Sequence, residues 1–170
     1  MKTFLIAIML TTFVFTPCTV HAQTMSASTN GVGPNGFDWT VGTWSCTNSM
    51  PPSPAGGPRN QTLTVTKTNS GALMYHATGA NFDNVWYNVY VPKSKTWVSP
   101  FIFADGSHGT ESTSQTGATI VWTGTATDAA GNATQIRDTN TYQATKYTDL
   151  GEYQSGGAWK TGYKLTCTKS

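Results

Sequence analysis

The sequence contains little charge. Charged residues make up 11% of its 170 positions, less than half of the ~25% that is typical of a soluble domain. Ten Lys and Arg stand against eight Asp and Glu, which gives a formal net charge of +2. Nucleic-acid binding through a basic face needs clustered Lys and Arg that neutralise phosphates, so this composition excludes it. The low content of charged residues also excludes a charged disordered tail and a coiled coil.

Leucine is also scarce, and no stretch after residue 36 shows a convincing helical period. The four leucines beyond that point are Leu63, Leu73, Leu150 and Leu165. Threonine is abundant, and aromatic residues make up 12% of the chain. Leu and Ala favour helices, whereas Thr and aromatic residues suit the half-buried surface of a pleated sheet. We therefore expect an all-β fold.

Catalytic motifs are absent as well. The sequence has no G-x-S-x-G, no H-E-x-x-H, no C-x-x-C and no Gly-rich phosphate loop. We therefore predict no catalytic residues and no metal ligands, and we name no cofactor. One alternative is an enzyme with a site formed by Asp105, His108 and Glu111, which follow one another at spacings of three. The Gly-rich surroundings favour a solvated turn there instead.

The N-terminus has the pattern of a secretory signal. Lys2 is followed by an apolar stretch over 4–15 and by small residues around Ala22. The stretch is shorter than the ~20 residues of a membrane-spanning helix. We predict a signal peptide over 1–22 that is cleaved after Ala22, and a secreted or periplasmic protein. A lipoprotein signal with a lipidated Cys18 is an alternative, although Pro17 occupies a position where a small residue is expected.

The rest of the chain divides into an arm and one domain. Residues 23–36 are rich in Ser, Thr, Asn and Gly, which predicts a flexible N-terminal arm. Residues 37–170 are long enough for one well-buried domain. This domain contains two cysteines, Cys46 and Cys167. An even pair in an exported protein predicts a disulfide, and closing a loop of that length stabilises a fold by ~4–5 kcal/mol in the chain-entropy model.

The domain shows short alternating apolar runs that are separated by turn residues. This pattern predicts an antiparallel barrel or sandwich. The two ends of the domain favour an up-and-down β-barrel of about 8–10 strands. The expected strands cover residues 37–47, 61–68, 72–79, 84–91, 96–104, 110–115, 119–128, 133–142, 147–154 and 163–169. An antiparallel pair with Cys46 opposite Cys167 would place Trp44 opposite Lys169. The first strand would then lie beside the last, as closure of a barrel requires.

Several segments resemble known families. Gly42-Thr43-Trp44 resembles the G-x-W motif of the calycin superfamily, which includes lipocalins and fatty-acid-binding proteins. That resemblance implies a barrel whose first-strand Trp44 fills one end, with a basic residue of the last strand, here Lys169, packed on it. More closely, 37–46, 121–124, 157–159 and 165–169 resemble a family of uncharacterised exported bacterial proteins. This second resemblance implies a fold and brings no assigned activity.

Two ligand-binding barrel families are less similar. Haem-binding barrels of the nitrobindin type carry G-x-W-x-G-x-G, whereas Ser45, Cys46 and Thr47 follow Trp44 here. Avidin-type barrels also start with G-T-W, but they need an Asn and a Ser soon after that Trp to bind biotin. Asn48 and Ser49 match that requirement only loosely.

The expected interior is rich in aromatic side chains. Trp86, Trp97, Phe101 and Trp122 each occupy one face of an expected strand, and small residues beside Trp122 leave room for a ligand. Arg137 is a candidate clamp for a carboxylate, with Tyr142 as its partner; the alternative is a surface pair with a nearby Asp.

His76 is a further candidate site residue, which could coordinate a haem or a metal ion if it faced the cavity. Its orientation depends on the preceding turn, because a two-residue loop would place Val65 opposite His76 and a three-residue loop would place it opposite Tyr75. A surface or hydrogen-bonded histidine is the simpler interpretation.

These features favour a binding module for a small apolar or amphiphilic ligand. Two other classes stay open. One is the enzyme with a site at the barrel mouth, and the other is a filled barrel that acts as a structural or interaction module. The sequence does not predict an oligomeric state.

Overall fold

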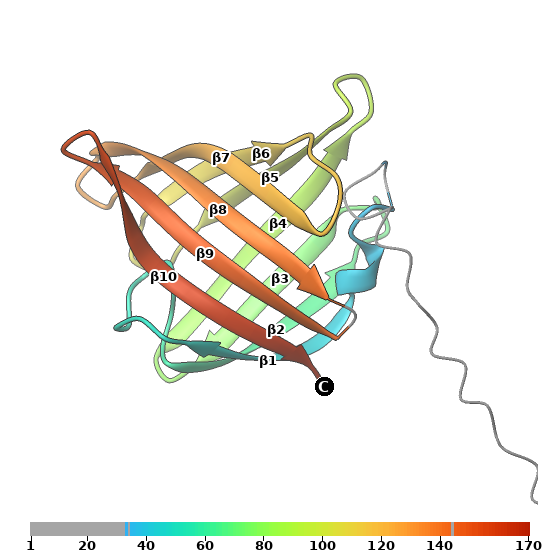
Figure 1. Ribbon diagram of the computed structural model, residues 1–170, viewed down its shortest axis with the longest axis horizontal. Coiled ribbons are helices and arrows are strands. Elements are labelled where there is room, and N and C mark those ends of the chain that lie inside the picture. The colour runs from blue at the N-terminus through green and yellow to red at the C-terminus, as the bar shows by residue number, and fades with distance from the viewer. Residues whose placement is uncertain (1–32, 34, 144) are drawn as a thin grey trace, which may run out of the picture.

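The computed structural model describes residues 33, 35–143 and 145–170, which form one closed antiparallel barrel (Figure 1). The all-β up-and-down fold that the sequence predicts is confirmed. Ten strands form the barrel: β1 (Gly42–Asn48), β2 (Asn60–Lys67), β3 (Leu73–Gly79), β4 (Phe82–Val91), β5 (Thr96–Ile102), β6 (His108–Thr113), β7 (Thr119–Thr127), β8 (Ala133–Gln143), β9 (Lys146–Ser155) and β10 (Ala158–Lys169).

Each strand pairs with its neighbour in sequence, and β10 returns to pair with β1. The register of this closing pair is the one that the cysteines predict, with Cys46 opposite Cys167 and Trp44 opposite Lys169. The disulfide between Cys46 and Cys167 is confirmed. Closure leaves no unpaired strand edge in the sheet. The disulfide is compatible with an extracellular or periplasmic protein.

The first predicted strand begins too early. Residues 37–41 do not extend β1; Asp38–Thr40 form a short 3-10 helix, η1, instead. The Thr40 hydroxyl donates a hydrogen bond of 2.7 Å to the carbonyl of Phe37, which favours the turn locally. Gly42 has a φ of 132°, a conformation open to glycine, and there the chain enters the sheet. The alternation of residue types before Gly42 therefore arises from packing inside the barrel.

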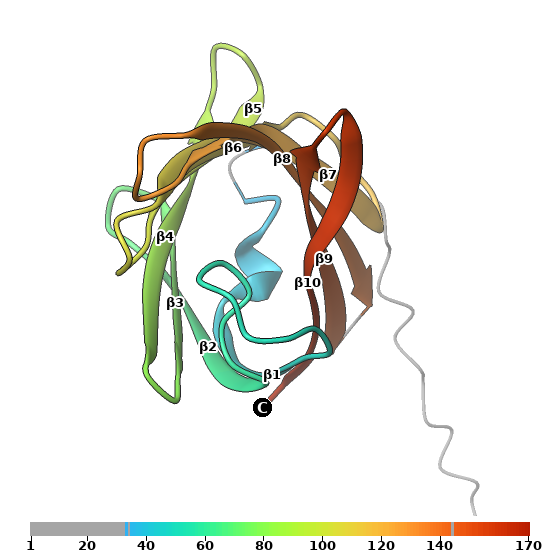
Figure 2. The same cartoon turned by 90° about the vertical axis from the view of Figure 1, so that its left-hand side faces the viewer.

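This N-terminal segment closes one end of the barrel. Phe37 is 0% exposed and lies edge-on to Trp97, with ring centres 5.0 Å apart. Trp44 donates a hydrogen bond of 2.7 Å from Nε1 to the carbonyl of Thr40. Lys169 Nζ lies 5.2 Å from the centre of the Trp44 ring and donates to the carbonyl of Trp39. In Figure 2, η1 lies within the ring of strands.

The loop between β1 and β2 lies across the opposite opening (Figure 2). Three buried amide side chains hold it there. Asn48 and Gln61 both donate to the carbonyl of Gly56, at 3.1 Å and 2.9 Å. Asn84 donates to the carbonyl of Pro54 at 3.0 Å. The loop is thus anchored to β1, β2 and β4.

Two sequence-based predictions concern segments that the structure does not describe. The signal peptide over 1–22 lies outside the described residues, as does most of the arm over 23–36. Within the part of the chain that is described, no helix has the length and apolar character needed to span a membrane.

Candidate functional site

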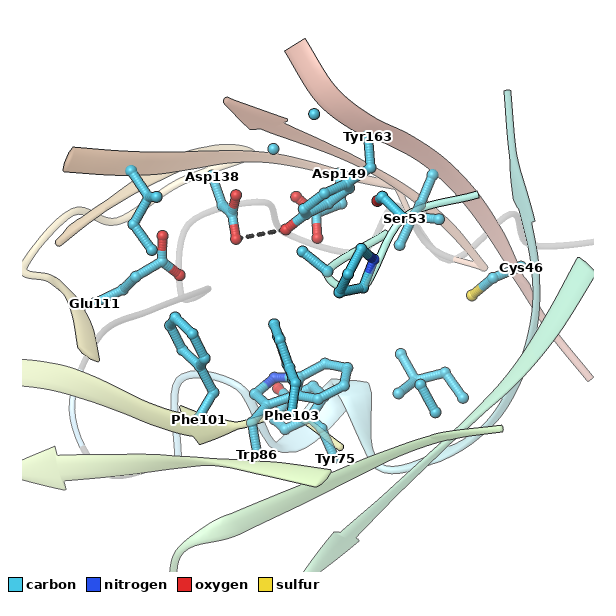
Figure 3. Close-up of a pocket in the computed structure, with 18 of the residues that line it drawn as sticks. Cys46, Ser53, Tyr75, Trp86, Phe101, Phe103, Glu111, Asp138, Asp149 and Tyr163 are labelled. Carbon is cyan, nitrogen blue, oxygen red and sulfur yellow. Dashed lines mark hydrogen bonds between the residues drawn. The ribbon is translucent and has the colours of Figure 1, made fainter. Parts of the chain in front are cut away.

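A cavity of about 650 Å³ occupies the barrel interior between η1 and the β1–β2 loop. Its volume is in the range of sites that hold a drug-sized molecule. The side chains around it differ from one side of the barrel to the other, as Figure 3 shows. Two groups of residues define these sides, and we call them the aromatic wall and the acidic wall.

The aromatic wall consists of Tyr75 on β3, Trp86 on β4, Phe101 on β5 and Phe103 just after β5. Tyr75 and Trp86 are directly opposite in the sheet, and their rings stack with centres 5.3 Å apart. The Phe101 and Phe103 rings also stack, at 4.9 Å. This wall offers flat apolar surface to whatever occupies the cavity.

The acidic wall consists of Glu111 on β6, Asp138 on β8 and Asp149 on β9 (Figure 3). All three side chains line the cavity. On β8, strand alternation places Asp138 on the same inward face as Asn140 and Tyr142. The Tyr163 hydroxyl on β10 donates a hydrogen bond of 2.6 Å to Asp138 Oδ2. The acidic wall therefore combines carboxyl groups from three strands with one phenol.

Part of this wall has no partner. Glu111 is 6% exposed, and its buried Oε1 has no hydrogen bond within the described residues. The same holds for Oδ1 of Asp149. An unpaired buried polar atom costs about 1–3 kcal/mol, and a charged one costs more. Such atoms at the edge of a cavity indicate that a hydrogen-bond donor is suited to that place.

Room for the Tyr163 side chain comes from Gly151. A Cβ atom added at Gly151 would lie 2.1 Å from the Tyr163 ring, so a larger residue there would displace the ring. Gly151 is directly opposite both Asp138 and Tyr163 in the neighbouring strands. The glycine thus allows the phenol to cross the strand between them and reach the carboxylate.

Burial raises the pKa of all three carboxyl groups. The pKa of Asp138 is raised to about 6 by burial, although the hydrogen bond from Tyr163 opposes this shift. Burial raises the pKa of Glu111 well above its ordinary value, and the charges of Asp138 and Asp149 add to the effect. Burial and then the charge of Asp138 do the same to the pKa of Asp149. These groups therefore titrate well above the ordinary range of carboxylic acids.

The distribution of charge in the molecule is uneven. Six of its eight acidic residues line the cavity or its mouth: Asp105, Glu111, Asp128, Asp138, Asp149 and Glu152. The other two, Asp38 and Asp83, contact Lys67 and His76 instead. Among the described residues that line the cavity, there is no Lys, Arg or His. A chain that is nearly neutral as a whole thus has a strongly acidic interior.

Four of the aromatic residues that the sequence singles out line the cavity: Trp86, Phe101, Trp122 and Tyr142. Trp97 does not, because it is 1% exposed and packs against Phe37 in the core at the closed end. Tyr142 lies across the end of the cavity near η1, where its ring packs on Trp39 with centres 4.5 Å apart.

Arg137 and His76 are not among the residues that line the cavity. Arg137 donates a hydrogen bond of 2.6 Å from Nε to Glu152, and its guanidinium lies 4.3 Å from the centre of the Trp159 ring. Arg137 and Tyr142 are five positions apart on one strand, so they lie on opposite faces.

For His76, the structure selects the three-residue turn. Val65 lies opposite Tyr75, so Tyr75 points inward and His76 points outward to Asp83 at 2.8 Å.

Asp105, His108 and Glu111 do not come together as one site. Glu111 lies inside the barrel and Asp105 lies at the cavity mouth, whereas His108 is exposed and contacts the carbonyl of Gly106. A spacing of three on a strand puts His108 and Glu111 on opposite faces. Within the described residues, no group of three His, Cys, Asp or Glu side chains is arranged to hold a metal ion.

The comparisons with known proteins add no relatives: no protein-family model matches this sequence, and a search of curated proteins finds no match. The architecture is compatible with a calycin-like barrel. The cavity is therefore the feature that bears most directly on function.

Proposed function

We propose that this protein binds a small apolar or amphiphilic molecule inside its barrel. The observation that supports this most strongly is the cavity of about 650 Å³, which has stacked aromatic rings on one side and unpartnered carboxyl oxygens on the other. Binding sites for small molecules are typically concave and mostly apolar, with a few polar groups that orient the ligand. A cavity of this size argues against a filled barrel with a purely structural role.

We further propose that the protein is an exported member of the calycin-like barrels. The G-x-W start and the pairing of Trp44 with Lys169 support the family assignment. The apolar stretch before residue 22 and the disulfide support export.

A fluorescent probe tests ligand binding directly. N-phenyl-1-naphthylamine is neutral and apolar, and it emits strongly only in apolar surroundings. We expect saturable binding to the wild-type protein, with one probe per molecule. Ala126 lines the cavity on β7, so Ala126→Trp should abolish the signal by filling the space. Ala133→Trp is the matched control, because Ala133 is exposed on β8.

The proposal fails if the wild-type protein gives no saturable signal, or if Ala126→Trp binds the probe as well as Ala133→Trp does. Circular dichroism verifies that both variants are folded. If Ala126→Trp does not fold, displacement of the probe by a long-chain alcohol replaces it. Displacement at one equivalent supports an internal site, whereas an unaffected signal contradicts it.

A further inference from the structure

We propose that the ligand carries a protonated amine on an aromatic or other apolar body, and that Glu111, Asp138 and Asp149 receive the ammonium group. This inference rests on the proposed function and specifies the chemical class of the ligand. It reverses the charge expected from the sequence, where Arg137 suggested a carboxylate ligand.

The first support is the missing counter-charge. Among the six acidic residues around the cavity, only Glu152 forms a salt bridge within the described residues, and its partner Arg137 does not line the cavity. Buried charges in proteins are normally paired. The described residues therefore supply no positive partner for the acidic wall, and a cationic ligand would supply one.

The second support is the geometry of the unpaired oxygen atoms. Glu111 is more than nine-tenths buried, and its carboxyl group points into the cavity, across from the ring of Phe101 (Figure 3). Its unpartnered Oε1 accepts hydrogen bonds once the group is ionised, and so does Oδ1 of Asp149. An ammonium group has up to three N–H donors, which matches a wall that offers acceptors on three strands.

The third support is the opposite wall. Stacked Tyr75 and Trp86 rings face the carboxyl groups across the cavity, as do Phe101 and Phe103 (Figure 3). The apolar body of an amine would pack on these rings, and aromatic faces also attract cations. A bare metal ion would use neither feature, and no described cluster is arranged to hold one. The combination favours an organic cation.

The cavity mouth is suited to the entry of a cation. Asp105 and Asp128 lie there, and hydrogen bonds from Ser107 and Asn132 lower the pKa of these two carboxyl groups. They are therefore ionised at neutral pH. Acidic groups around an opening raise the local concentration of cations and speed their association.

Binding of the amine should depend on pH. Glu111, Asp138 and Asp149 face one another, and the groups around them are Tyr142, Tyr147, Tyr163 and Glu152. Burial raises the pKa of the three tyrosines well above their ordinary value, so they stay neutral. Glu111, Asp138 and Asp149 therefore ionise at a higher pH than ordinary carboxylic acids, while a primary amine stays protonated at neutral pH. We therefore expect affinity for the amine to rise with pH as these groups ionise, and protons to be released on binding.

The test uses three probes with one indole body: tryptamine, tryptophol and indole-3-propionate, which are cationic, neutral and anionic at pH 8. We expect isothermal titration calorimetry to show tryptamine binding at least about tenfold more tightly than tryptophol, and no binding of the anion. Tryptamine affinity should fall at least about tenfold in Glu111→Gln, while tryptophol affinity changes little. Asp83→Asn is the matched control, because Asp83 does not line the cavity and contacts His76 instead.

The outcomes separate the two proposals. If tryptophol or indole-3-propionate binds as tightly as tryptamine, the amine inference is wrong and the proposed function stands. An equal loss of tryptamine affinity in Glu111→Gln and Asp83→Asn also contradicts the inference. If none of the three indoles and no N-phenyl-1-naphthylamine binds, the proposed function fails as well. Glu111→Gln replaces a buried carboxyl group by an amide of nearly the same shape, so it is expected to fold.

Discussion

The two walls of the cavity have opposite energetic effects on the same barrel. The aromatic wall is neutral, its rings stack on one another, and its burial stabilises the fold. The acidic wall buries three carboxyl groups that repel one another and have no basic neighbour among the lining residues. It therefore makes ionisation costly and the folded state less stable at neutral pH. A feature that costs stability and still occupies the centre of the molecule is the best indication of where function is located.

The largest expected effect concerns the aromatic wall. Tyr75→Ala should lower the free energy of unfolding by about 3–4 kcal/mol, because it leaves a cavity beside Trp86 and removes the contact of 3.1 Å with the Thr40 hydroxyl. Urea denaturation measures this. Tyr75→Phe keeps the ring and should lose only about 1 kcal/mol. A loss below 1 kcal/mol for Tyr75→Ala would show that this wall does not stabilise the barrel.

The acidic wall should behave in the opposite way. Glu111→Gln is expected to raise the free energy of unfolding at pH 8 by about 1–3 kcal/mol, since it removes a carboxyl group whose ionisation is opposed by burial and by the neighbouring carboxyl groups. In contrast, Glu152→Gln breaks the ion pair with Arg137 and should lower stability by less than about 1 kcal/mol. Urea denaturation at pH 8 measures the free energy of unfolding of both variants. A change of the same sign in both would contradict the expected difference between Glu111 and the paired Glu152.

The pH dependence of the wild-type protein follows from the same wall. The pKa of Asp138 is raised to about 6 in the folded protein, so the folded state binds more protons than the unfolded state between about pH 4 and 6. Its stabilising contribution is complete below pH 4 and is lost as pH rises through 6. The difference for this group is of order 3 kcal/mol. Denaturation at a series of pH values should therefore show stability falling over this range, and a rise would contradict the assignment.

A smaller effect is expected at the phenol that contacts the acidic wall. Tyr163→Phe removes the hydrogen bond of 2.6 Å to Asp138, which holds the pKa of that carboxyl group down. We expect the pKa of Asp138 to rise further and stability at pH 8 to fall by about 1 kcal/mol. Carbon-13 NMR of the Asp138 carboxyl group measures the first effect. An unchanged pKa would show that Tyr163 only fills space.

Much of the barrel could be predicted from the sequence, because strand alternation and turn residues are local signals. The acidic wall could not be found in the same way, although one signal was available. Tyr142 was expected inside, and alternation along its strand then places Asp138 inside and Arg137 outside. Arg137 was a candidate for an inward carboxylate clamp, with a surface ion pair as the alternative, and in the structure it pairs with Glu152. Glu111 was likewise grouped with His108 by sequence spacing, whereas the two side chains lie on opposite faces of β6.

Other positions could not be decided from local signals. The orientations of Tyr75 and His76 depended on whether a turn contains two or three residues, and only the pairing of β2 with β3 selected between them. Residues 37–41 alternate in the manner of a strand, yet Phe37 enters the barrel end because the surrounding rings of Trp97 and Trp122 leave an apolar space there.

By itself, the sequence determined the all-β class, the barrel and the Cys46–Cys167 pairing, since the spacing of its strands and cysteines specifies which ends meet. Only the tertiary structure decided what the interior contains. Glu111, Asp138 and Asp149 are separated by 27 and 11 positions in a chain of 170 residues, and barrel closure brings them to one side of one cavity. Burial then changes their acidity, which is a property of that shared space and not of any local pattern.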